Sequence, residues 1–251
     1  MLRKVIRTFV AAFVMWTSVI FAVGQAEHPL PRPQARTPQE FDLYLEYLGA
    51  IGPEAKHTMA LRFETTYPKS ELLINVYESE FEYFLAHEQR QDAITAAEWA
   101  LRLNPNNARV LVDLAEVLPN ATNDKVTLSK AEEYARMAMV ELNQMRFSRD
   151  VPMSSCEDMR STLLSQAHAA LGDVLGKRGE LADAIKELET AITISPEPSG
   201  SELLLAGKLY RLAKRHQEAM SMFRRAAQAG PAAVTVRANI ELSEMSHGVS
   251  N

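Results

Sequence analysis

The stretch AIKELETAITISP, residues 184–196, carries the pattern that decides the fold. Its two alanines lie seven residues apart, and a proline follows that a helix cannot continue through. The same spacing recurs at 93–105 and 219–231, and residues 131–139 keep its helical part with Asn143 in place of the proline. Small residues at this spacing let two helices approach closely, and repetition at a fixed period is typical of stacked helix pairs. We therefore predict an all-α chain.

The leading alanines of the four copies set the register of the repeats. They lie at 93, 131, 184 and 219, so successive gaps exceed a period of about 34 residues by 4, 19 and 1. We assign the first excess to a loop from Pro119 to Lys125. The second covers Met145 to about Ser161, where a loop meets an early helix start capped by Ser154 or Ser155. Repeats one to four are then predicted at about 74–107, 108–145, 165–198 and 200–232.

Repeats three and four show the same order of small and large residues on their two helices. In repeat three this order is Leu171-Gly172, Leu175, Gly179, Ala184, Leu188, Ala191 and Pro196. In repeat four it is Ala206-Gly207, Tyr210, Ala219, Phe223, Ala226 and Pro231. Over residues 70–232 this order resembles that of a tetratricopeptide repeat. Repeat one departs from it with Glu80-Phe81, and repeat two lacks both the glycine and the closing proline.

The resemblance implies a right-handed superhelical stack of antiparallel helix pairs, an α-solenoid. Alanines, leucines and aromatics at these positions are then core residues, and Gly172 and Gly207 permit close helix crossing. Repeats of this kind form binding scaffolds, so the resemblance also implies a protein or peptide partner. The resemblance is specific for the fold and indicates almost nothing about the identity of that partner.

Helical segments are also predicted on both sides of the repeats. Residues 37–69 read as a degenerate helix pair, which begins with the capping sequence Thr37-Pro38-Gln39-Glu40 and continues with a second helix at 53–66. The apolar residues Phe41, Leu45 and Leu48 share one face of its first helix. After repeat four, residues 233–246 are predicted to form an amphipathic helix that covers the last open face. Its apolar positions include Val236, Ile240 and Leu242.

The first 26 residues are predicted to be a signal peptide. Three basic residues precede an apolar run at 9–24, and small residues follow it as export cleavage sites require. The alternatives are a membrane anchor formed by residues 9–24 and a buried helix, although the run is short for a membrane span. A proline-rich linker is predicted at 27–36. We therefore expect an exported protein, periplasmic or secreted, with the membrane-anchored form as the alternative.

The charge and the cysteine count narrow the function classes. Without residues 1–26 the chain has 24 basic and 32 acidic residues, a net charge of −8, which does not suggest a nucleic-acid partner. Cys156 is the only cysteine, so no intramolecular disulfide is possible. It reads either as a buried bystander or as the site of an intermolecular disulfide. Residues 146–156 read either as a contact loop or as a segment packed over neighbouring helices.

The resemblance also implies a concave groove lined by the first helix of each repeat. The positions expected to face outward into it are Glu78, Glu82, Val112, Glu116, Ala169, Asp173, Leu204, Lys208 and Arg211. From these we take the candidate protein-binding residues Glu78, Glu82, Glu116, Asp173, Lys208 and Arg211. The acidic majority predicts a basic or extended partner segment and argues against a clamp for a carboxylate tail. The alternative is that these acidic residues form only a solvated face.

Patterns for catalysis are absent from the sequence. The six histidines are scattered without Asp, Glu or Cys at metal-ligand spacing, and no phosphate-binding loop or nucleophile elbow occurs. His168 reads as a core-edge residue. We therefore predict no catalytic residue, no metal and no cofactor, and an exported scaffold or adaptor rather than an enzyme. The alternatives are a membrane-anchored assembly factor, a subunit of an envelope complex and an unrecognised hydrolase.

Overall fold

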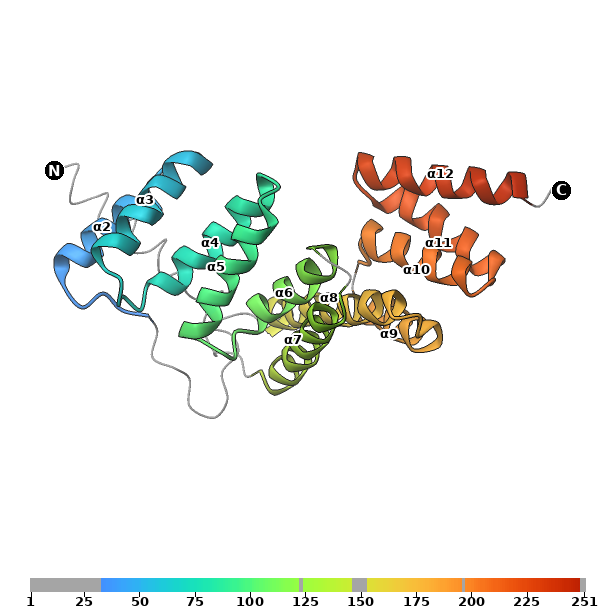
Figure 1. The fold of residues 1–251 in the computed structure, drawn as a ribbon, viewed down its shortest axis with the longest axis horizontal. Helices are drawn as coiled ribbons and strands as arrows, with labels where there is room; N and C mark the ends of the chain where they lie inside the picture. Colours follow the sequence, from blue (N-terminus) through green and yellow to red (C-terminus); the bar gives the residue numbers. More distant parts are fainter. Residues whose placement is uncertain (1–32, 122–123, 146–152, 196, 249–251) are drawn as a thin grey trace. The chain divides into compact units, whose positions relative to one another are not determined.

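The computed structural model describes residues 33–121, 124–145, 153–195 and 197–248. All regular secondary structure in these ranges is helical, as the repeat pattern of the sequence predicts (Figure 1). The helices are α2 (Pro38–Leu48), α3 (Pro53–Thr66), α4 (Leu73–Ala86), α5 (Arg90–Leu103), α6 (Ala108–Ala121), α7 (Lys125–Gln144), α8 (Met153–Lys177), α9 (Leu181–Ile194), α10 (Gly200–Leu212), α11 (His216–Ala229) and α12 (Ala232–Gly248). The predicted signal segment 1–26 and Pro196 lie outside the described residues.

The helices divide into two compact units. The first unit covers the chain up to residue 110 together with 140–157, and the second covers 111–139 together with 158–251. In the first unit α4 packs on α5, and α3 packs on both α2 and α4. In the second unit α10 packs on α9 and α11, and α12 packs on α11 and α10. The helices that pair within a repeat, such as α4 with α5 and α10 with α11, follow one another in the sequence.

The turn between the two helices is the same in repeats one, three and four. Its middle residue has a positive φ, which is 61° at Glu88, 83° at Gly179 and 60° at Lys214. In each turn the next residue donates its N–H to the carbonyl five residues back, over 2.8 to 2.9 Å. This is the pattern of a Schellman motif, which favours glycine at the left-handed position. Only Gly179 meets that preference, so Glu88 and Lys214 adopt a strained backbone.

Close crossing of the paired helices follows the predicted glycines. A Cβ atom on Gly207 would lie 2.5 Å from the ring of Phe223, and one on Gly172 would lie 2.9 Å from Cγ of Leu188. Repeat one places Phe81 where the glycines stand and Ala97 where Phe223 stands, and both residues are buried. By register, the large side chain has therefore moved from the second helix of the pair to the first.

Repeat two departs from the prediction at its first helix. The expected loop from Pro119 does not begin there, because α6 continues through Pro119 to Ala121. Side chains satisfy carbonyl groups at this helix end. Asn120 Nδ2 donates to the Glu116 carbonyl over 2.9 Å, and Lys177 Nζ donates to the Pro119 carbonyl over 2.8 Å.

The N-terminal helix α2 is capped as predicted, but its apolar stripe is not its main packing face. Thr37 Oγ1 accepts a hydrogen bond from the Glu40 N–H at 3.1 Å. The buried residues of α2 are Glu40, Leu43, Tyr44 and Tyr47. Phe41 is 40% exposed, and Leu45 and Leu48 are half-buried. Leu43 and two tyrosines, rather than the predicted stripe, therefore hold α2 in the first compact unit.

The last helix, α12, also packs with a face other than the predicted one. Its buried residues include Ala238, Glu241 and Met245, and Ala238 packs in a cluster with Leu203 and Ala226. Val236 is 60% exposed and Ile240 is 43% exposed, although we expected both to cover the core. The small Ala238 allows α12 to approach α10 and α11 closely, which turns the branched residues outward.

The insertion before repeat three is helical where the structure describes it. Helix α8 begins at Met153, so Ser154 and Ser155 lie inside the helix and do not cap it. Cys156 is buried in α8, as the bystander interpretation expected. Residues 146–152 of the insertion lie outside the described residues. Among the described helices, none is long and apolar enough to cross a membrane.

Candidate protein-binding face

The six candidate groove residues are divided between the two compact units. Glu78 and Glu82 lie on α4 in the first unit. The other four lie in the second unit, on α6, α8 and α10, and they are Glu116, Asp173, Lys208 and Arg211.

Glu78 is held in place by the residue that precedes α6. Asn107 Oδ1 accepts from the Val110 N–H at 3.3 Å, as a capping side chain does. The amide nitrogen of the same Asn107 side chain donates to Glu78 Oε1 at 2.5 Å. One helical turn further along α4, Glu82 is exposed. A fixed carboxylate and an exposed one therefore lie on the same helix.

The same side of α4 reaches α2 through a second asparagine. Asn75 Nδ2 donates to the Tyr44 hydroxyl at 2.9 Å. Burial raises the pKa of Tyr44, and the negative charge of Glu78 raises it further. The phenol therefore keeps its proton and remains a hydrogen-bond donor at neutral pH. We call this set the α4 polar face, and its members are Tyr44, Asn75, Glu78, Glu82 and Asn107.

The candidate residues in the second compact unit are more strongly neutralised by their own chain. Asp173 forms an ion pair with Lys177 at 2.8 Å, one turn away on α8. Arg211 pairs with Glu241 and, at 3.1 Å, with Glu244, both on α12. Glu116 and Lys208 are half-buried. Arg211 therefore anchors the last helix to α10.

Two further positions that we expected to face outward are buried instead. Val112 is fully buried, and Ala169 is buried within the core cluster of the second compact unit. Leu204 is half-buried and packs against the same cluster. The buried Val112 and Ala169 side chains therefore stabilise the stack and are not available to a ligand.

Sequence reasoning missed three members of the α4 polar face, namely Tyr44, Asn75 and Asn107. Asn107 precedes an apolar helical run, so its role as a cap was readable from the sequence. Its bond to Glu78, 29 residues away, was not readable. Tyr44 and Asn75 come from helices of different pairs, so only the packing of α2, α3 and α4 brings them together.

A second polar cluster joins α3 to α4 in the first compact unit. His57 Nδ1 contacts Glu80, which is buried at the position where repeat three has Leu171. The His57 ring stacks on the Tyr83 ring, with the ring centroids 4.5 Å apart. The centroid of the His87 ring lies 4.2 Å from that of the same tyrosine. Burial raises the pKa of Glu80, and the contact with His57 opposes that rise. The cluster is therefore a titratable link between two helices.

A further histidine–carboxylate contact lies in the second compact unit. His168 is half-buried, with Nδ1 2.6 Å from a carboxylate oxygen of Glu187, which fits a core-edge residue. Within the described ranges, no three or more His, Cys, Asp or Glu side chains gather in a way that could hold a metal ion. The α4 polar face thus offers hydrogen bonds and negative charge to a ligand.

Comparisons with known proteins agree with this architecture. The sequence profile of the tetratricopeptide repeat family matches residues 79–121 and 169–234. No curated protein matches the chain. Among solved structures, YrrB, described as a TPR protein with an unusual peptide-binding site, is 16% identical with a TM-score of 0.52, and the match covers 82% of this chain and 92% of YrrB.

Two other solved structures show the same fold. PilF of Pseudomonas aeruginosa is 16% identical with a TM-score of 0.53, over 84% of this chain and 86% of PilF. MamA is 16% identical with a TM-score of 0.51, over 70% of this chain and 88% of MamA. At this identity the likeness concerns the fold, and the family profile adds the repeat itself. The matched profile shows tetratricopeptide repeats at residues 79–121 and 169–234, and the helix pairs with their small-residue crossings agree with it.

Proposed function

We propose that this protein is an exported scaffold that binds an extended segment of a partner protein on the α4 polar face. Tetratricopeptide repeats bind peptide or protein partners, generally without catalysis, on the extended surfaces of their helix stacks. The observation that carries the proposal is the pair of Glu78 and Glu82 on one helix, with Asn107 fixing the first carboxylate. A preorganised carboxylate loses little side-chain entropy when a cation binds to it.

The chemistry of the α4 polar face favours a basic segment in an extended conformation. Helices α2 to α5, residues 37–103, carry five basic and twelve acidic residues, a net charge of −7. Such a surface attracts basic segments and speeds their encounter. The half-buried Asn75 adds an amide group that a partner's peptide backbone can use, and the buried Tyr44 hydroxyl accepts a hydrogen bond from that amide. The candidate residues of the second compact unit contribute less, because Asp173 and Arg211 are already paired.

Export is the second part of the proposal. Its support is the basic start of the chain and the apolar run at 9–24. N-terminal sequencing of the protein from its native cell tests it. A mature chain that begins near residue 25 or 27 supports the exported adaptor. A chain that begins at Met1 in the membrane fraction supports the anchored assembly factor instead.

A photo-crosslinking residue placed at Glu82 in the native cell tests the binding face. We expect a partner to crosslink at position 82, and we expect this crosslink to be lost when Glu78→Lys is added. In a separate pull-down without the crosslinker, Glu78→Lys/Glu82→Lys should fail to recover the same partner. The matched control is Glu133→Lys/Glu157→Lys, which changes the charge equally at exposed positions on α7 and α8. Unchanged partner recovery by the Glu78→Lys/Glu82→Lys variant would contradict the proposed face.

A further inference from the structure

A row of apolar side chains on α2 borders the α4 polar face. Phe41, Leu45 and Leu48 follow one another at single helical turns along α2, and we call them the α2 apolar row. Phe41 is 40% exposed, and the two leucines are half-buried. The fully buried residues of α2 lie on its other side, and the helix packs on α3. The α2 apolar row therefore leaves apolar surface open to solvent.

Tyr44 joins this row to the α4 polar face. On α2, Tyr44 follows Phe41 by three residues and precedes Leu48 by four, so both side chains flank it on the helix surface. The Tyr44 hydroxyl accepts the hydrogen bond from Asn75 on α4 at 2.9 Å. On α4, Glu78 follows Asn75 by three residues and lies on the same face of that helix. Apolar and polar groups thus meet where this hydrogen bond joins the two helices.

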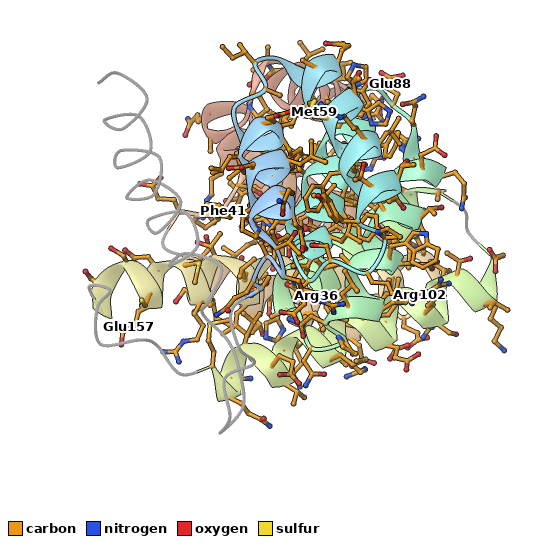
Figure 2. All side chains as sticks on the ribbon, turned by 90° about the vertical axis from the view of Figure 1, so that its left-hand side faces the viewer. Arg36, Phe41, Met59, Glu88, Arg102 and Glu157 are labelled. Atoms are coloured by element: carbon orange, nitrogen blue, oxygen red, sulfur yellow. The ribbon has the colours of Figure 1, made fainter. Side chains whose placement is uncertain are left out.

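The α2 apolar row lies on the side of the first compact unit that is away from α5. Figure 2 labels Phe41 on α2 and Arg102 on α5 at opposite sides of this unit. Helix α5 packs on α4, whose buried residues lie opposite Asn75, Glu78 and Glu82 on the helix surface. The polar residues of α4 and the apolar row of α2 therefore both lie away from α5, where one ligand can contact both.

The charge of these two helices determines which partner suits the surface. Helices α2 and α4 each carry three acidic residues and no basic residue. Glu82 is exposed on α4, one turn from the fixed carboxylate of Glu78. Complementary charge therefore favours a basic ligand beside the apolar row. The end helices of a second copy are poor occupants, because α12 has two acidic residues and one basic residue, and α2 has acidic residues only.

We propose that the basic segment bound on the α4 polar face also places an apolar side chain on the α2 apolar row. The partner is then a segment in which an apolar residue lies close to its cations, and Phe41 is a specificity-determining residue. This inference rests on the proposed function. The acidic residues alone attract any basic chain, whereas contact with the apolar row distinguishes one basic segment from another. The aromatic ring supplies contact area at a low cost in side-chain entropy.

Fluorescence anisotropy of labelled synthetic peptides with the full chain tests the proposal at low salt, where charge attraction is strongest. The basic–apolar peptide carries the core Lys-Gly-Lys-Gly-Leu between serines. In the basic peptide serine replaces the leucine, and in the apolar peptide serines replace the lysines. Each peptide is also made with its core reversed, so that either chain direction can bind.

We expect the wild type to bind the basic–apolar peptide about tenfold more tightly than the basic peptide, because the leucine buries apolar surface on the row. Phe41→Ser should remove this advantage and leave the affinity for the basic peptide unchanged. The control is Leu61→Ser on α3, which replaces an apolar residue of the same unit that is 50% exposed outside the row. It should keep the advantage. Far-UV circular dichroism checks that each variant is folded, and Leu48→Ser repeats the test if Phe41→Ser is unfolded.

The variant Glu78→Lys/Glu82→Lys separates this inference from the proposed function. If it loses both basic peptides while the wild type binds them equally well, the inference alone is overturned. An advantage of the leucine that persists in Phe41→Ser, or an apolar peptide that binds as tightly as the basic–apolar one, also overturns the inference alone. Basic peptides that bind this variant as they bind the wild type, or that bind neither protein, overturn the proposed function and the inference together.

Discussion

Repeat one and the C-terminal helices meet the same packing requirements with different side chains. By register, repeat one has Phe81 and Ala97 at the helix crossing where repeat four has Gly207 against Phe223. Each pair combines one large and one small buried side chain, so the two pairs have a similar combined volume. The comparison teaches that the fold requires a sum of volumes at this crossing and does not require a glycine on a particular helix.

The two regions also differ in how they neutralise a buried glutamate. Glu80 on α4 and Glu241 on α12 occupy the same position of the repeat, where repeat four has Ala206. Glu80 contacts His57, and burial raises the pKa of the Glu80 carboxyl group. Glu241 is fully buried between Arg211 and Arg237 and forms an ion pair with each. The first region is therefore expected to respond to pH and the second to ion-pair disruption.

The largest expected effect comes from emptying the crossing of repeat one. Phe81→Gly should lower the free energy of unfolding by about 3–5 kcal/mol, because it leaves a large cavity between α4 and α5. Ala97→Phe alone should also destabilise, through overpacking. Urea unfolding followed by the fluorescence of Trp99 on α5 measures both.

The double variant Phe81→Gly/Ala97→Phe rebuilds the arrangement of repeat four. We expect it to be more stable than either single variant, and a double-mutant cycle gives the coupling between the two sites. Strictly additive losses would mean that Phe81 and Ala97 do not face each other, and the comparison of the two crossings would then be wrong.

The next effect concerns the buried carboxylate of the second region. Glu241→Gln should lower stability by about 3 kcal/mol, because it leaves two arginines without their buried partner. Hydrogen exchange should show the loss first in α12. The control is Glu244→Gln, which removes an exposed carboxylate from the same Arg211 and should change stability by less than about 1 kcal/mol. Equal losses in the two variants would contradict a special role for the buried pair.

The pH response of Glu80 should be smaller and should have a definite sign. Because burial raises the pKa of Glu80 in the folded protein, the folded state binds this proton more tightly than the unfolded state. Its contribution to stability is therefore fully present below the ordinary pKa of 4.5 and is lost as pH rises through the raised value. The measurement is the free energy of unfolding in urea of the wild type and of Glu80→Gln across this pH range. The difference between the two proteins isolates the contribution of Glu80. A difference that grows in favour of the wild type with rising pH would have the wrong sign.

The smallest expected effect concerns the strained turns. Glu88→Gly in repeat one and Lys214→Gly in repeat four should each raise stability by up to about 1 kcal/mol, because glycine adopts a positive φ without strain. Gly179→Ala should lower stability by a similar amount. Thermal unfolding monitored by circular dichroism measures all three changes. A loss of stability in both glycine variants would show that chain entropy outweighs the strain.

Much of the helix-pair architecture could be predicted from local sequence. The Thr37 cap, the helix at Pro53–Thr66 and the close approach at Gly207 follow from short-range rules and appear in the structure. The end of α6 could not be predicted, because Lys177 satisfies the carbonyl of Pro119 from 58 residues away. The ion pairs of Arg211 could not be predicted either, because its partners Glu241 and Glu244 lie on another helix.

Only part of the candidate face could be predicted, again because some of its members meet through long-range contacts. Glu78 and Glu82 follow from the repeat register, whereas Asn75 and Tyr44 meet only through the packing of separate helices. The outward faces of α2 and α12 also escaped prediction. Phe41 and Ile240 look like core residues because they are apolar and regularly spaced, and periodicity does not state which of two apolar faces is covered.

The sequence by itself determined the helix pairs, many of their boundaries and the positions where helices cross. These properties depend on spacing, capping and side-chain size within about 35 residues, and all three can be read from the sequence. Only the tertiary structure decided which charges are neutralised and which apolar stripes stay exposed. Those outcomes depend on contacts between helices far apart in the sequence, where one ion pair such as Arg211 with Glu241 removes a residue from the binding surface and gives it a structural role.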